Sequence, residues 1–212
     1  RDLRMSRGLG DVYKRQAYVG EDWILKDVSF KVKAKENVAF VGATGSGKTT
    51  ILSLIVRNYD IQKGQIFIDG LDIKKYQIAS LRKHIGQMLQ DVFLFSGTVE
   101  SNITLRSEEI TSDIVKEACR FVNADKVIDK LPNKYNEIVR ERGKNFSSGE
   151  RQLISFARVV SHKPNIMILD EATSNIDTET EALIQDSLKK MMNIGTMLIV
   201  CLLYTSDAAD DK

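Results

Sequence analysis

The feature that most constrains this chain is a glycine-rich segment, Gly42-Ala-Thr-Gly-Ser-Gly-Lys-Thr49, which fits the pattern GxxxxGK[ST]. An apolar run, 37–41, precedes it, and a stretch with apolar residues at helical spacing, 49–59, follows it. This strand–loop–helix order is the context that the pattern needs, because its glycines let backbone N–H groups curl around phosphate oxygens at a helix start. The weaker alternative is a glycine-rich turn without that role.

The pattern assigns a role to each part of the segment. Lys48 is expected to reach the β- and γ-phosphates and to take part in catalysis, and the Thr49 hydroxyl is expected to bind Mg²⁺. The cofactors that follow from these roles are ATP and Mg²⁺. The expected phosphate cradle comprises Gly42, Ala43, Thr44, Gly45, Ser46, Gly47, Lys48, Thr49 and Thr50.

A second motif is a continuous apolar run that ends in two acids, Ile166-Met-Ile-Leu-Asp170-Glu171. A strand buried on both faces would deliver Asp170 beside the metal. Glu171, the next residue, is expected to polarise the attacking water as the general base. Two acids after a strand can also simply begin a loop, and the glycine-rich segment in the same chain makes that reading weaker.

Composition narrows the class of protein. The 212 residues carry a net charge of only +2, which gives no electrostatic footprint for nucleic acid. Two cysteines, Cys119 and Cys201, cannot form a disulfide scaffold and favour a reducing compartment. The longest apolar run, 197–204, has eight residues, whereas a membrane span needs about 20, so we expect the chain to be soluble.

Both ends differ from the rest of the chain. Residues 6–16 resemble the in-frame translation of a transposase sequencing adaptor, and residues 201–206 match the reverse complement of the same DNA. We therefore expect residues 1–16 and 201–212 to be adaptor-like artefacts and residues 17–200 to be the biological domain. The alternative is an exposed native tail at each end.

Strand and helix patterns alternate along the domain. Strands are expected at 24–32, 37–41, 65–69, 165–169 and 196–200, and helices at 49–59, 110–129, 149–160 and 178–192. This alternation predicts an α/β core with a mostly parallel sheet, and a largely helical insert is expected at about 96–162.

A third segment, Asn145-Phe-Ser-Ser-Gly149-Glu150-Arg-Gln, opens a helical pattern shortly before the acidic motif. Alone it reads as a helix cap. Together, in this order and spacing, the three motifs resemble those of an ABC ATPase domain over essentially all of residues 17–200. The resemblance implies a P-loop NTPase fold with a RecA-like core, an antiparallel β subdomain and a helical subdomain that carries the signature segment.

The resemblance also implies further ligand contacts. Tyr18 matches the aromatic residue that stacks on adenine, and Gln90 matches the Q-loop glutamine that contacts Mg²⁺ and water. In the family the signature segment and the D-loop, here 174–177, contact the ATP that a partner domain holds in a head-to-tail dimer. The residues expected to contact the partner's ATP are Ser147, Gly149, Glu150 and Asp177.

Two departures from the family pattern stand out. The usual signature LSGGQ is Phe146-Ser-Ser-Gly-Glu150 here, so that only Ser147 and Gly149 match. The switch histidine expected just after Val200 is missing, and neither His84 nor His162 lies where a substitute would be found. The truncated chain is therefore expected to be impaired in ATP turnover.

Two other segments, 91–102 and 141–143, look like those of exporters, whose ATPase domain is fused to a transmembrane domain. The expected parent protein lies in the cell membrane with this domain on the cytoplasmic face, and its own transmembrane domain is absent from this chain. An intact Glu171 beside an altered signature resembles one half of a heterodimeric exporter. A homodimer that tolerates the variation is the alternative.

The leading hypothesis is thus an ATPase that drives export across a membrane. One rival is a soluble ABC ATPase of DNA repair, chromosome structure or translation, but the coiled-coil, zinc or strongly basic features of such proteins are not visible in the sequence. A second rival is a nucleotide-binding fragment without useful turnover.

Overall fold

The computed structural model describes residues 9–17, 23–89, 92–170 and 178–202. A four-stranded sheet forms its centre, with strand order β3-β10-β9-β6 and all neighbours parallel. Its strands are β3 (Asn37–Gly42), β6 (Ile85–Met88), β9 (Ile166–Asp170) and β10 (Thr196–Leu202). Every residue of β9 is buried, as its continuous apolar run predicts.

A second, antiparallel sheet with order β2-β1-β4-β5 lies beside the first. Its strands are β1 (Leu9–Ala17), β2 (Trp23–Phe30), β4 (Lys63–Ile68) and β5 (Leu71–Asp72). Helix α1 (Lys48–Ile55) packs between the two sheets, because its Leu52, Leu54 and Ile55 share one core with residues of β4 and of β9 and β10. A 3₁₀ turn (Ile73–Lys75) and α2 (Ile78–Lys83) lead from β5 to β6.

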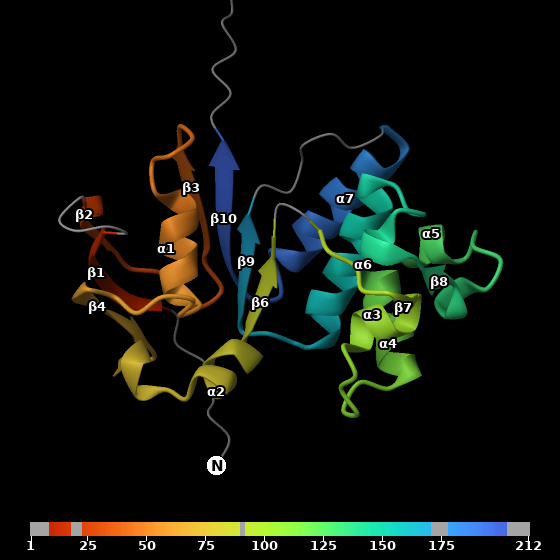
Figure 1. Cartoon of the computed structure of the whole chain (residues 1–212), viewed down its shortest axis with the longest axis horizontal. Coiled ribbons are helices and arrows are strands. Elements are labelled where there is room, and N and C mark those ends of the chain that lie inside the picture. Colours follow the sequence, from red (N-terminus) through yellow and green to blue (C-terminus); the bar gives the residue numbers. More distant parts are fainter. Residues whose placement is uncertain (1–8, 18–22, 90–91, 171–177, 203–212) are drawn as a thin grey trace, which may run out of the picture.

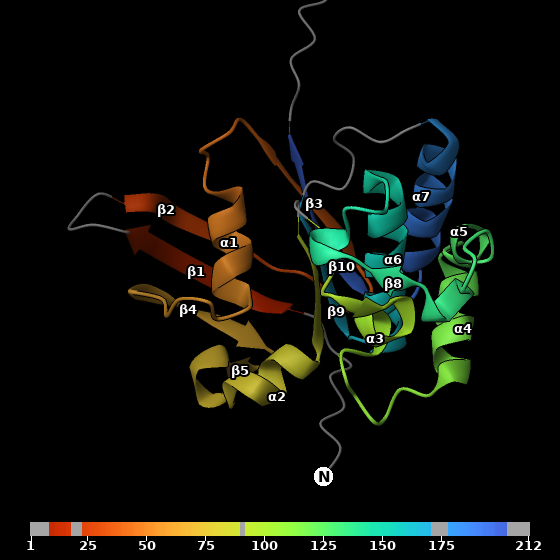
Figure 2. The same cartoon turned by 45° about the vertical axis from the view of Figure 1, so that its right-hand side comes forward.

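A largely helical region covers the other side of the parallel sheet (Figures 1 and 2). Its helices are α3 (Val99–Thr104), α4 (Ser112–Phe121), α5 (Asp125–Ile128) and α6 (Ser148–Ser161), and α7 (Thr178–Met191) packs against α6. The short pair β7 (Gly97–Thr98) and β8 (Ile138–Val139) and 3₁₀ turns at Lys134–Asn136 and Glu141–Gly143 complete it. A single core joins these helices to Met167, Leu169 and Met197 of the parallel sheet.

This architecture confirms the α/β fold class, with a parallel core, an antiparallel β subdomain and a helical subdomain. The prediction of one helical stretch over 110–129 was wrong in detail. The chain leaves α4 at Phe121 and turns through Asn123, whose φ of 57° is left-handed, before α5 begins. The side chain of Asn123 holds this turn by hydrogen bonds with Asp186 and Ser187 of α7, and sequence periodicity cannot show a contact of that kind.

The two ends assigned to adaptor sequence both contribute strand residues. Residues 9–16 lie in β1, which pairs with β2 and β4, and residues 201–202 extend β10 alongside β3. A strand ladder is made by backbone groups, which every sequence carries, so the artefact assignment stays a prediction. Among the described residues, no helix combines the length and apolar character needed to cross a membrane.

Candidate nucleotide-binding site

The glycine-rich loop connects the carboxyl end of β3 to the first turn of α1. Gly45 and Gly47 adopt φ values of 82° and 89°, which are left-handed and suit a residue without a Cβ. Gly47 is the N-cap of α1 and provides no side-chain cap. The loop therefore presents backbone at a helix N-terminus, the arrangement that favours a bound anion.

Lys48 curls back over this loop. Its ammonium donates hydrogen bonds to the carbonyl oxygens of Gly42 and Ala43, at 2.6 and 2.8 Å, and lies 3.3 Å from the Ser46 hydroxyl. The residue is only 8% exposed. A buried positive charge held by neutral oxygen atoms is poised to exchange them for phosphate oxygens, since charge-assisted hydrogen bonds are the stronger ones.

Asp170 lies at the carboxyl end of β9, on the same edge of the sheet as the loop. In register, Val200 of β10 stands between Asp170 and Phe40 of β3, so about 10 Å separates the two outer strands. Thr49, in the first turn of α1, spans this gap because its side chain hydrogen-bonds with the Asp170 carboxyl. The structure thus brings together Lys48, Thr49 and Asp170, which are far apart in the sequence.

The electrostatics of Asp170 fit a metal ligand. Asp170 is 8% exposed, and burial raises the pKa of its carboxyl above the ordinary value, although the Thr49 hydrogen bond and the Lys48 charge oppose the rise. A nearby cation would compensate the buried negative charge. Mg²⁺ is usually held by one or two carboxylates together with phosphate oxygens, so Asp170 and the Thr49 hydroxyl are a sufficient protein contribution. The described residues contain no group of three or more His, Cys, Asp and Glu side chains that would form an all-protein metal site.

The signature segment forms the N-terminus of α6. Ser147 is the N-cap, and its hydroxyl accepts a hydrogen bond from the Glu150 N–H while the Glu150 carboxylate accepts one from the Ser147 N–H. This reciprocal pair is a capping box. Glu150, which departs from the usual glutamine, thus has a structural role within its own helix.

Helix α6 and the glycine-rich loop do not meet within the chain. Figures 1 and 2 place α1 on one side of the parallel sheet and α6 and α7 on the other. The residues expected to contact a partner's ATP, Ser147, Gly149 and Glu150, therefore lie on the opposite side of the parallel sheet from Lys48 and Thr49. Four further expected site residues, Tyr18, Gln90, Glu171 and Asp177, lie outside the described residues.

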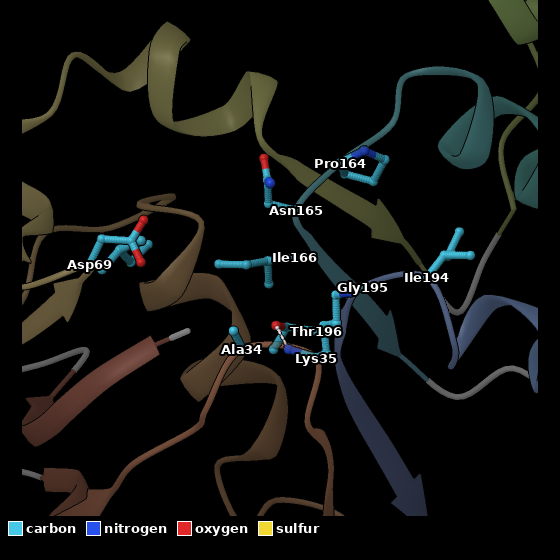
Figure 3. Close-up of a pocket in the computed structure, with 10 residues that line it drawn as sticks. Ala34, Lys35, Asp69, Pro164, Asn165, Ile166, Ile194, Gly195 and Thr196 are labelled. Carbon is cyan, nitrogen blue, oxygen red and sulfur yellow. Dashed lines mark hydrogen bonds between the residues drawn. The ribbon is translucent and has the colours of Figure 1, made fainter. Parts of the chain in front are cut away.

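The pocket in Figure 3 is not part of the nucleotide-binding site. It has a volume of about 290 Å³ and is lined by residues that include Ile166 and Thr196, the first residues of β9 and β10. The Lys35 N–H donates to the Thr196 hydroxyl at its edge, at 2.8 Å. The pocket therefore lies at the amino ends of the parallel strands, whereas nucleotide sites in such sheets form at the carboxyl ends.

Sequence reasoning missed two residues that shape the region after Gln90, namely Asn102 and Arg158. Both contact the segment Phe93–Phe95, whose outer side chains are exposed although its central Leu94 is fully buried. The Phe-Leu-Phe order was a sequence signal for an extended segment here, because alternate side chains of an extended backbone point to opposite sides. It did not point to Asn102 or Arg158.

Comparison with known proteins agrees with this geometry. A family model described as ABC transporter matches residues 25–174. A Bacillus subtilis protein named as a probable multidrug resistance ABC transporter ATP-binding/permease protein, YheH, is 48% identical over 92% of this chain and 29% of its own length. The multidrug resistance protein pgp-1 of Caenorhabditis elegans is 42% identical over 84% of this chain and 13% of its own length.

A solved structure of a bacterial Atm1-family ABC exporter with ATP bound superimposes with a TM-score of 0.85 at 34% identity, over 94% of this chain and 35% of that one. This chain thus spans about a third or less of the length of these relatives. Both the family match and the fold show that the chain belongs to the ABC transporter family, as an ATPase domain of that family.

Proposed function

We propose that this domain binds ATP with Mg²⁺ and hydrolyses it in a head-to-tail pair with a second ABC ATPase domain, and that this hydrolysis drives export of a substrate across a membrane. The observation that carries the proposal is the contact between Thr49 and the buried Asp170 beside Lys48. It joins the phosphate-binding loop to a carboxylate suited to Mg²⁺ at one edge of the sheet.

In this site Lys48 would hold the β- and γ-phosphates, and Thr49, Asp170 and Gln90 would hold the metal. The bound Mg²⁺ supplies neutralisation of the charge that develops on the transferred phosphoryl group. Glu171, directly after Asp170, would orient the attacking water and accept its proton. Tyr18 would stack on adenine.

The second ATPase domain would complete the site. The N-terminus of α6 presents Ser147 and Gly149 on the side of the sheet opposite α1, so the loop and the signature segment of one domain cannot complete each other's site. Two copies placed head to tail satisfy both surfaces, and Asp177 would lie at their interface. We favour a heterodimer because the signature is altered at Glu150 whereas Glu171 is retained; a homodimer is the alternative outcome.

A transmembrane part of a longer polypeptide would couple ATP hydrolysis to transport of the substrate. Both relatives are about three or more times as long as this chain, and the name of the Bacillus subtilis protein combines ATP binding and permease in one chain. The exporter-like loop at Glu141 lies against the segment after Gln90, since a Cβ on Gly143 would approach Leu94 to 3.1 Å. We place the domain at the cytoplasmic face of the membrane, where ATP is available, as the ATP-binding part of a chain that also carries a permease part.

The test is ATP hydrolysis by the full-length polypeptide in lipid, measured as phosphate release. Lys48→Ala is expected to lose nucleotide binding and hydrolysis together. Glu171→Gln is expected to keep binding but to lose about 10²-fold or more of the hydrolysis rate, as removal of a general base does. Hydrolysis that persists in both variants would refute the proposed site.

A further inference from the structure

A second cavity, larger than the one in Figure 3, lies near the amino end of β6. It has a volume of about 670 Å³. Its lining comes from the end of α2, the start of β6, the connection between α3 and α4, and the end of α6 (Figure 1). Cavities of about 300–1,000 Å³ are typical of small-molecule sites. A ligand here would lie apart from the nucleotide, which binds at the carboxyl ends of the strands.

The apolar part of this lining is aliphatic. Ile85, Ile110 and Val159 line the cavity and are themselves buried in the two cores, so their positions are fixed by packing. Leu105 and Ile114 add further aliphatic surface. The described lining residues include no Phe, Tyr or Trp, the rings on which a nucleobase usually stacks. The lining therefore suits an aliphatic chain better than a planar ring.

The charged part of the lining is mostly cationic. Among the described residues it comprises Arg82, Lys83, Arg158, His162 and Lys163, with Glu109 as the one carboxylate. The guanidinium groups of Arg82 and Arg158 each donate three hydrogen bonds to neutral oxygens, at 2.7–3.2 Å. Neutral acceptors satisfy the N–H groups but leave both positive charges uncompensated.

The ionisation of two lining residues reflects this excess of positive charge. Burial lowers the pKa of Arg158 to about 10. Burial also lowers the pKa of His162, and the charges of Arg158 and Lys83 act in the same direction, against a hydrogen bond with the Ile103 backbone and the charge of Glu109. An anion bound beside these groups would favour their charged forms and offset the cost of burying the Arg158 guanidinium.

An exposed ion pair joins two sides of the cavity. The Lys83 ammonium, at the end of α2, donates to both oxygens of the Glu109 carboxylate, at 3.1 and 3.2 Å. The two side chains are 66% and 75% exposed, and a pair this exposed contributes little to stability. Lys83 can therefore exchange the Glu109 carboxylate for that of a ligand at little cost.

We propose that this cavity binds the anion of a medium-chain fatty acid, with its aliphatic chain against Ile85, Ile110 and Val159 and its carboxylate on Lys83 in place of Glu109. The apolar lining matches the chain, and the uncompensated cations match the carboxylate. The site is separate from the nucleotide-binding site, and the inference does not depend on the proposed function.

The first measurement is equilibrium dialysis of the chain against radiolabelled decanoate, kept below its micelle concentration. One saturable site is expected, with a Kd on the order of 10–100 µM. Octanoate, which is two methylenes shorter, should bind about five- to ten-fold more weakly because less apolar surface is buried. Decan-1-ol has the same chain without the charge and should bind at least about five-fold more weakly. MgATP should not displace decanoate.

Two variants of the ion pair make the decisive comparison. Lys83→Gln and Glu109→Gln break the same contact but change the charge in opposite directions. Lys83→Gln should weaken decanoate binding about five-fold, whereas Glu109→Gln should tighten it about five-fold, because it removes the competing carboxylate. Lys31→Gln, between β2 and β3, is the control for net charge and should leave the Kd within about two-fold.

The inference is overturned if decanoate shows no saturable binding or if decan-1-ol binds equally well. It is also overturned if Lys83→Gln and Glu109→Gln shift the Kd in the same direction, since only the broken contact would then matter, or if Lys31→Gln weakens binding as much as Lys83→Gln. Displacement by MgATP would place the fatty acid in the nucleotide-binding site and contradict the inference as well. A chain that binds decanoate as described but not MgATP would contradict the proposed function and support this second site.

Discussion

Glu150 caps its own helix and is also expected to contact a partner's ATP, and these two roles can be tested separately. Its carboxylate closes the capping box with Ser147, and it is also expected to face the phosphates of a partner's ATP. Glu150→Gln separates these roles, because a glutamine oxygen can still accept the Ser147 N–H while the negative charge is gone. Ser147→Ala has the opposite character, since it removes the cap and leaves the charge.

The expected magnitudes differ accordingly. Loss of the Ser147 cap should cost about 1 kcal/mol of unfolding free energy, or about 2–4 °C in Tm for a chain of this size. Glu150→Gln loses only the favourable interaction of its charge with the helix dipole, about 0.3–1 kcal/mol. Two unit charges about 5 Å apart repel by about 1–3 kcal/mol at a protein surface, so removing the charge should tighten ATP-dependent dimerisation about ten-fold.

The assay is sedimentation velocity over a protein concentration series with Mg²⁺ and a non-hydrolysable ATP analogue. Glu150→Gln should shift the dimerisation constant to lower concentration, whereas Ser147→Ala and the control Glu117→Gln, on the exposed face of α4, should not. An unchanged dimerisation constant in Glu150→Gln would refute the placement of Glu150 against the partner's phosphates. A Tm loss equal to that of Ser147→Ala would refute the reasoning about the cap.

Asp170→Asn should raise the free energy of unfolding at pH 7, measured by chemical denaturation, because the buried carboxylate of the wild type is charged there whereas the amide is neutral. The raised folded-state pKa of Asp170 stabilises the wild type at low pH, and that contribution is lost as the pH rises. The difference between the two proteins should therefore vanish towards pH 4. Gly143→Ala should destabilise the chain by about 1–3 kcal/mol in urea unfolding, because the glycine has a φ of 70° and a Cβ there would lie 2.9 Å from the Arg151 side chain. Asn123→Ala should cost about 2 kcal/mol or more in the same assay, since it leaves the buried hydroxyl of Ser187 and its neighbours without that amide, whereas Asn133→Ala, at the surface, should cost much less.

The motifs predicted which residues the fold brings together, whereas periodicity missed several short elements. The pattern 42–49 and the acid after β9 were sufficient to bring Lys48, Thr49 and Asp170 together, because parallel strands end at one edge of the sheet. The short elements α2, β6 and α3 were not predicted, since six or fewer residues do not complete a recognisable period.

The remaining features depend on contacts between distant segments. Asn102 and Arg158 look like ordinary polar helix residues in the sequence, and only the folded chain shows that both hold the backbone of Phe93–Phe95. Likewise, Glu150 departs from the expected glutamine in the signature, and only the folded chain shows that its carboxylate closes a capping box with Ser147.

The proposed Mg²⁺ site is tested by the Kd for ATP in the presence of Mg²⁺ and in EDTA, measured by calorimetry in the wild type and in Asp170→Asn. Mg²⁺ is predicted to tighten wild-type binding by about ten-fold or more, because the ion would lie between the phosphates and the buried carboxylate beside Thr49. In Asp170→Asn this benefit should be largely lost while binding in EDTA is retained. An equal benefit from Mg²⁺ in both proteins would contradict the account.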